Sequence, residues 1–98
     1  MSGQNIAIQG ENYSTALTEL KIICKDLTDE DIVPLQLMTN LSFLDLRGNR
    51  INNLSPLAGL SNLRKLWLDD NKITDVKPIA RLSNLTHSNF AQQRQEKA

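Results

Sequence analysis

The sequence predicts an α/β repeat solenoid, a short right-handed coil with a parallel sheet on its concave face and 3₁₀ or short helical segments on its convex side. The first observation is a spacing of 22 residues that recurs along most of the chain. The second is that two complete units, 41–62 and 63–84, place apolar residues at seven matching positions. Because one unit cannot bury its own apolar side chains, the recurrence indicates units that stack on one another. The landmarks at this spacing are Pro34, Pro56 and Pro78; Asn40, Asn62 and Asn84; and Leu41, Leu63 and Leu85.

The repeats divide a single domain, 1–98, into successive segments. We expect an N-terminal cap over 1–16, repeats over 17–40, 41–62 and 63–84, and a degenerate repeat with a polar tail over 85–98. The first repeat is two residues longer than the others, and its acidic run at 29–31 predicts a solvated turn. In the last unit Ser88 stands where a leucine is expected, although Phe90 keeps the next apolar position.

The segment before the first repeat alternates in a different way. Between Ile6 and Tyr13 apolar and polar residues take turns, which is the period of a β-strand. The first coil needs a cover for its apolar side chains. The segment therefore predicts an edge strand or a flap over that coil.

Each repeat opens with a short alternating stretch that predicts a strand. In the stretch 43–47, Leu44 and Leu46 should point into the coil, so that Phe43, Asp45 and Arg47 point onto the open face of the sheet. The 22-residue register carries this assignment to the other repeats. The predicted rows across the sheet are Glu19, Phe43, Lys65 and His87; Lys21, Asp45, Trp67 and Asn89; and Ile23, Arg47, Asp69 and Ala91.

The remainder of each repeat predicts how the chain turns and returns. Asn49 and Asn71 follow their strands, and their amide groups can bond backbone atoms that a turn leaves unpaired, which predicts an asparagine ladder. Pro56 suits the first turn of a short helix or 3₁₀ segment, since its missing N–H has no partner there in any case. Leu54 and Val76 occupy one of the seven matched apolar positions and should both face the core.

The pattern L-x-x-L-x-L-x-x-N-x-I is the leucine-rich-repeat signature. The stretch from Pro56 to Leu63, PLAGLSNL, resembles the internalin-type class of bacterial leucine-rich repeats, and residues 6–20 resemble the cap that opens such arrays in surface proteins of Gram-positive bacteria. The resemblance covers about residues 6–90. It implies a scaffold that binds other molecules and carries no shared catalytic residues.

We therefore expect a non-catalytic module that binds another protein through the concave face of the sheet. Trp67, the only tryptophan, should lie at the centre of that face with Phe43 on the adjacent strand, and exposed aromatic residues beside charges are typical of binding hot spots. Cross-strand ion pairs, Lys21 with Asp45 or Arg47 with Asp69, are the alternative role for the charges. The predicted contact residues are Lys21, Phe43, Asp45, Arg47, Lys65, Trp67 and Asp69.

An alternative function is structural. In that case the chain is a capping or scaffold fragment of a longer array, with no ligand of its own, and it self-associates through its C-terminal end. Eleven basic and eleven acidic residues cancel, so nothing in the charge favours nucleic acid as a partner, and no apolar stretch is long enough for membrane insertion. No signal peptide opens this sequence, which fits a cytoplasmic protein or a fragment of a longer surface protein.

Few residues suggest chemistry. His87 is the only histidine and Cys24 the only cysteine, so we expect no metal, no cofactor and no catalytic pair. Cys24 takes the place of Gly48 in the repeat and is expected to be a small, partly buried filler. Asp69 and Asp70 lack the spacing of a calcium-binding loop.

Overall fold

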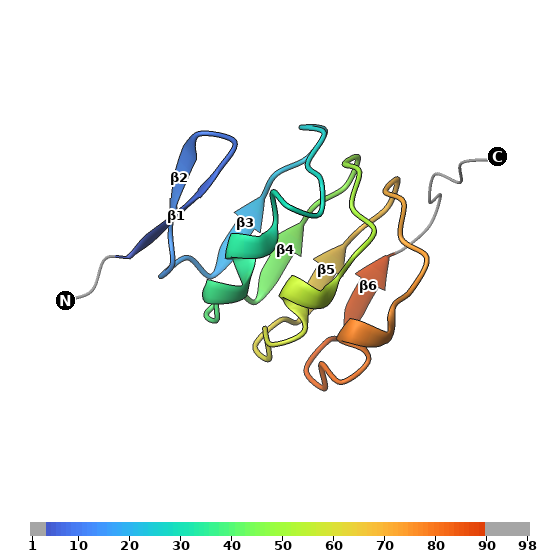
Figure 1. Cartoon of the computed structure of the whole chain (residues 1–98). Helices are drawn as coiled ribbons and strands as arrows, with labels where there is room; N and C mark the ends of the chain where they lie inside the picture. Colours follow the sequence, from blue (N-terminus) through green and yellow to red (C-terminus); the bar gives the residue numbers. More distant parts are fainter. Residues whose placement is uncertain (1–3, 90–98) are drawn as a thin grey trace, which may run out of the picture.

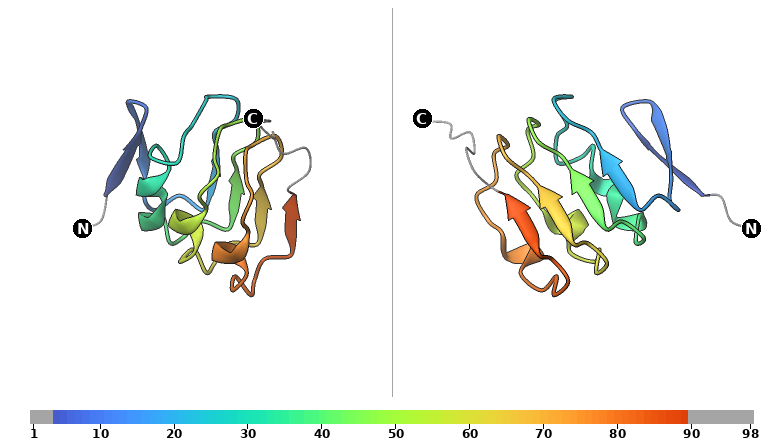
Figure 2. Two further views of the ribbon diagram at one scale, coloured as in Figure 1. Left: turned by 45° about the vertical axis from the view of Figure 1, so that its right-hand side comes forward. Right: turned by 180° about the vertical axis from the view of Figure 1, so that it is seen from behind.

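A computed structural model describes residues 4–89 and shows a right-handed stack of coils (Figure 1). Each coil contributes one strand to a parallel sheet in the order β3 (Glu19–Lys21), β4 (Phe43–Asp45), β5 (Lys65–Trp67) and β6 (His87–Asn89). The opposite side carries three 3₁₀ segments, η1 (Val33–Leu37), η2 (Ser55–Leu57) and η3 (Lys77–Ile79). The views in Figure 2 show the sheet on one side of the stack and these segments on the other. The predicted solenoid is confirmed.

The register of the sheet is the one that the repeat spacing predicts. Phe43 pairs with Lys65, Asp45 with Trp67, and Leu44 with Leu66. The same offset continues into β6, where Lys65 pairs with His87. The first two rows are therefore confirmed in full. Phe90, expected at an apolar position, and Ala91, expected in the third row, lie outside the described residues.

The core lies between the sheet and the 3₁₀ segments. Leu44, Leu46, Leu66 and Leu68 point inward from the strands and are completely buried. Leu57 of η2 meets them from the opposite side and is also completely buried. Alternation along the strands thus separates a closed core from an open face, as expected.

At one matched apolar position the side chains are not buried to the same extent in every coil. Ile32 and Leu54 are completely buried, whereas Val76, at the same repeat position, is 46% exposed. The expectation that Val76 faces the core is therefore wrong. It belongs to the last complete coil, and within residues 4–89 no further coil packs beyond it. A leucine-rich-repeat coil buries its apolar residues fully only when a neighbour covers it.

The predicted asparagine ladder is present. The Asn49 side-chain oxygen accepts hydrogen bonds from the backbone N–H of Lys25 and Leu27, both at 3.0 Å. Its nitrogen donates to the carbonyl groups of Ile22 at 2.8 Å and Leu46 at 2.9 Å. Asn71 repeats the arrangement one coil further on, with a bond to the Leu46 carbonyl of the coil before. The ladder joins adjacent coils through buried backbone groups that would otherwise lack partners.

The return segments also follow the sequence. Proline occupies the first turn of η1, η2 and η3. The Asn53 side chain accepts the N–H of Ser55 at 3.0 Å, and Asp75 accepts the N–H of Lys77 at 3.0 Å. Asn53 and Asp75 each precede the N-cap residue, and their side-chain oxygens satisfy the first N–H of the 3₁₀ segment as Asx turns do.

The N-terminal segment forms a separate hairpin, β1 (Asn5–Ile8) paired antiparallel with β2 (Glu11–Ser14). Gln9 and Gly10 both have positive φ, 51° and 83°, as a tight two-residue hairpin turn requires. The hairpin belongs to a different sheet from β3–β6, so it is a flap and not an edge strand. Ile6 and Ile8 are buried and close the first end of the core.

The acidic turn of the longer first repeat has a structural role. One Asp29 oxygen accepts the backbone N–H groups of Asn52 at 2.7 Å and Asn53 at 2.9 Å, in the next coil. Asp31 accepts the N–H and hydroxyl of Thr28. The segment is a turn at the surface, as expected, and two of its three carboxylates also hold backbone donors in fixed positions.

Candidate binding face

The open face of the sheet carries the residues that the sequence singled out, at three different depths. Lys21, Arg47 and Lys65 are exposed. The half-buried members are Phe43, Trp67 and Asp69, while Asp45 is only 1% exposed. Asp45 is therefore covered by its neighbours. The expectation that it contacts a partner directly is wrong, because its side chain is not accessible.

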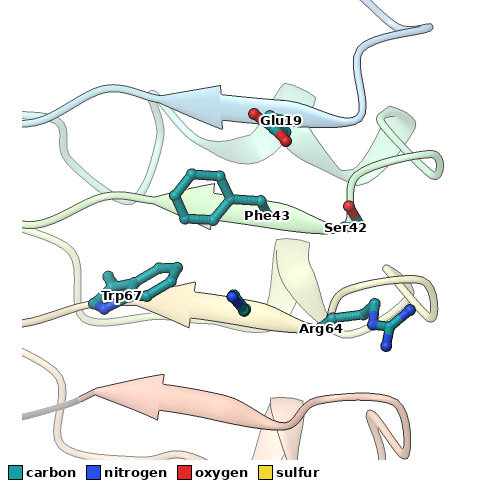
Figure 3. Close-up of a pocket in the computed structure, with 6 residues that line it drawn as sticks. Glu19, Ser42, Phe43, Arg64 and Trp67 are labelled. Carbon is teal, nitrogen blue, oxygen red and sulfur yellow. The ribbon is translucent and has the colours of Figure 1, made fainter.

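Phe43 and Trp67 form an aromatic pair at the centre of the face. Their ring centroids lie 4.8 Å apart and the ring planes are nearly perpendicular, at 89°. They are diagonal neighbours, because Asp45 is the register partner of Trp67 and Lys65 that of Phe43. Figure 3 shows the two rings turned toward each other above β4 and β5. Edge-to-face pairs of this kind add about 0.5–1.5 kcal/mol beyond the area they bury, so each ring holds the other in place.

Asp45 and Arg47 form an ion pair within one coil. The Arg47 Nη2 donates to one carboxylate oxygen at 2.7 Å and Nε donates to the other at 2.8 Å. The backbone N–H of Arg47 adds a third bond, at 3.2 Å. The hydrogen bond to Asp45, followed by the charge of Asp45 itself, raises the pKa of Arg47 above its ordinary value. Both oxygens of the buried carboxylate are thus occupied, and its charge is cancelled inside the protein.

The cross-strand ion pairs that the sequence allowed are not formed. Arg47 pairs with Asp45 instead, and among the described residues neither Lys21 with Asp45 nor Arg47 with Asp69 forms an ion pair. Alternate residues of an extended strand point to the same face. Arg47 can therefore fold back along its own strand to Asp45. Asp69 still acts on Arg47 through space, since its charge contributes to the raised pKa of Arg47.

A hollow of about 490 Å³ lies against the aromatic pair. Three of its lining residues, Phe43, Lys65 and Trp67, were predicted, and Glu19 was placed in the first row. Sequence reasoning missed Ser42 and Arg64, which come just before their strands. The available signal was Arg64 itself, a large cation at a repeat position that Thr18, Ser42 and Thr86 otherwise fill.

The described residues around this face do not gather into a metal site. Residues 4–89 contain no group of three or more histidine, cysteine, aspartate and glutamate side chains able to hold a metal ion. Cys24 is exposed, which corrects the expectation of a partly buried filler, and it adopts a positive φ of 55° at the position of Gly48. His87 is exposed beside Lys65. In the same part of the chain, no helix has the length and apolar character to cross a membrane.

Comparison with known proteins agrees with this architecture. Residues 39–81 match the family described as "Leucine Rich repeats (2 copies)". Internalin C2 from Listeria monocytogenes is 44% identical with a TM-score of 0.60 over 65% of this chain, and internalin F from the same organism is 26% identical with a TM-score of 0.73 over 86%. The chain spans only 29% and 25% of those two structures, and no curated protein matches it. The repeat register, the parallel sheet and these two likenesses show that the chain is a leucine-rich-repeat solenoid similar to the internalins of a bacterium.

Proposed function

We propose that this chain binds another protein through the open face of its sheet, with the Phe43–Trp67 pair at the centre of the contact. Leucine-rich repeats typically mediate protein–protein interaction, and solenoids commonly use the surface formed by their strands. The proposal makes the chain a non-catalytic binding module.

The aromatic pair is the observation that carries this proposal. The core behind it is already closed, because Leu44 and Leu66 on the same two strands are completely buried. Phe43 and Trp67 are therefore not needed to fill the coil, yet two large rings lie partly exposed against each other. Rigid aromatic side chains beside a hollow and surrounded by charge match the composition of binding hot spots.

Trp67→Ala tests the proposal, with Leu37→Ala as a matched control. Leu37 is 57% exposed and lies in η1, on the side of the stack away from the sheet. Trp67→Ala should lower the free energy of unfolding by about 1–3 kcal/mol, since it removes one partly buried ring and one edge-to-face contact. The same variant should lose the proteins that wild type captures from a bacterial or host-cell extract, whereas Leu37→Ala should keep them. If both variants capture the same set, the sheet face is not the binding surface.

A structural role is the second candidate, and the exposure of Val76 favours it. The coil of η3 leaves this residue 46% exposed where the coils before it are closed, and β6 is an edge strand of the described sheet. A second copy stacked on this end would cover both. Sedimentation velocity over a hundredfold range of concentration should then show a dimer that Val76→Asp abolishes, and a constant monomer mass would refute self-association.

A further inference from the structure

We propose that the segment bound in the hollow is acidic, with a carboxylate placed beside an apolar side chain. This inference rests on the proposed function and specifies the chemistry of the partner. In this arrangement the apolar side chain covers the Phe43–Trp67 pair, and the carboxylate lies over the β5 side of the hollow, where Arg64 and Lys65 stand.

The charges of the face are divided into compensated and uncompensated groups. Asp45 and Arg47 cancel each other within the protein, and Asp45 is buried. Arg64 and Lys65 are exposed neighbours that line the hollow, and neither forms an ion pair with any residue of 4–89. Two adjacent cations without an acidic partner offer a carboxylate the strongest kind of hydrogen bond available on this surface.

The one acidic residue that lines the hollow, Glu19, does not form an ion pair with Arg64 or Lys65. Glu19 pairs in register with Phe43, and Phe43 pairs with Lys65, so Glu19 lies two strands from Lys65. Strands are spaced about 4.8 Å apart, which puts the two backbones roughly 10 Å from each other. Figure 3 shows Glu19 on the far side of the Phe43 ring and Arg64 extending past the start of β5, away from Glu19. An occupant of the hollow therefore meets positive charge on its β5 side.

The aromatic pair and the cations lie close enough for one short segment to reach both. Lys65 and Trp67 are two residues apart on β5, and alternate residues of a strand point to the same face. Their separation along the strand is about 7 Å. Neighbouring side chains of a single bound peptide cover such a span. The pairing of an apolar anchor with a nearby charge is also what gives an interface both affinity and orientation.

A phage-displayed library of random 12-residue peptides, selected on the immobilised full chain, provides the probe. The enriched peptides should carry aspartate or glutamate next to a large apolar residue. Because Trp67 is the only tryptophan, peptides synthesised without tryptophan should shift its emission when they bind. Their Kd should weaken severalfold between 0.1 and 1 M salt, as the screening length falls from about 10 to about 3 Å.

The decisive comparison uses two double variants with the same change in net charge. Arg64→Glu with Lys65→Glu should weaken peptide binding about tenfold or more, while preserving Trp67 as the reporter. Lys77→Glu with Arg81→Glu alters exposed residues on the η3 side of the stack and should leave the Kd unchanged. Thermal unfolding of both double variants should match wild type, since all four positions are exposed.

The outcomes separate this inference from the proposed function. The inference is overturned, and the proposed function stands, if the selected peptides need Trp67 but are not enriched in acidic residues. The same holds if their Kd is unchanged in the double variant Arg64→Glu with Lys65→Glu. A 20-nucleotide single-stranded DNA that shifts Trp67 emission as strongly as the best peptide also overturns it, because phosphate would then be the preferred anion. Failure to select any peptide that distinguishes wild type from Trp67→Ala overturns both.

Discussion

Among side chains of its size, we expect that of Asn49 to contribute most to the free energy of unfolding of the stack. Its side chain is completely buried and bonds five backbone groups, three of them through fully buried contacts, to Leu27, Ile22 and Leu46. Leaving a buried donor or acceptor without a partner costs about 1–3 kcal/mol. Three such groups amount to roughly 3–9 kcal/mol, and water entering the vacated volume recovers part of that.

We therefore expect Asn49→Ala to lower the free energy of unfolding by about 3–5 kcal/mol. A domain of this length has a total stability of about 5–15 kcal/mol, so the loss is a large share of it. Urea titration followed by Trp67 fluorescence and by far-ultraviolet circular dichroism measures the change. Agreement between the two probes also establishes that the stack unfolds as one unit.

Asn52→Ala is the matched control for this prediction. Asn52 also links two coils, since its oxygen accepts the N–H and hydroxyl of Thr74, but it is exposed and water can replace it. Its loss should cost about 1 kcal/mol or less. Equal losses for Asn49→Ala and Asn52→Ala would refute the argument that burial, rather than the number of hydrogen bonds, sets the importance of the ladder.

Two further predictions concern the turn and the end of the array. Gly48 has a φ of +75°, and a β-carbon there would lie 2.7 Å from the Cys24 sulfur. Gly48→Ala should therefore lower the free energy of unfolding by about 1–3 kcal/mol, through backbone strain and this clash. Adding Cys24→Ala to the same chain should restore only the part of the loss that the clash causes. Thermal unfolding of the single and double variants measures this, and full recovery would show that backbone strain contributes nothing. Leu54→Ala should cost about 2–5 kcal/mol because that side chain is fully buried, whereas Val76→Ala at the same repeat position should cost less than about 1.5 kcal/mol. Equal losses in urea titrations would mean that Val76 is covered in solution.

The repeat spacing explains why so much of this fold could be predicted from one sequence. A strand places alternate side chains on opposite faces, so a single correctly phased strand determines which residues of all the others face the core. The phase is unambiguous at Leu44 and Leu46, and the offset of 22 transfers it to Leu66 and Leu68. The asparagine ladder was predictable for a related reason. A turn leaves backbone groups unpaired at the same place in every coil, and an amide can satisfy donors and acceptors together.

Features outside the repeat could not be predicted in the same way. The segment 5–14 alternates like a strand, but alternation does not say which strand it pairs with. The positive φ of Gln9 and Gly10 turns it back on itself, so it forms a hairpin that covers the core end instead of extending the sheet. The role of Asp29 depends on the longer turn, whose path brings its carboxylate to the N–H groups of Asn52 and Asn53. No periodic pattern describes a contact made by an irregular turn.

The burial of Asp45 could not be predicted from the alternation of residues along the strand. Alternation correctly placed it on the open face, yet the depth of a side chain on a face depends on what its neighbours do. Here Arg47 lies over the carboxylate and Trp67 is its register partner, so a short acidic side chain between two long ones becomes buried. The consequence reaches the function. Because Asp45 is occupied in holding Arg47, it is not available to neutralise Lys65 or to attract a basic partner. This uncompensated Lys65 is one reason for the proposed preference of the hollow for a carboxylate.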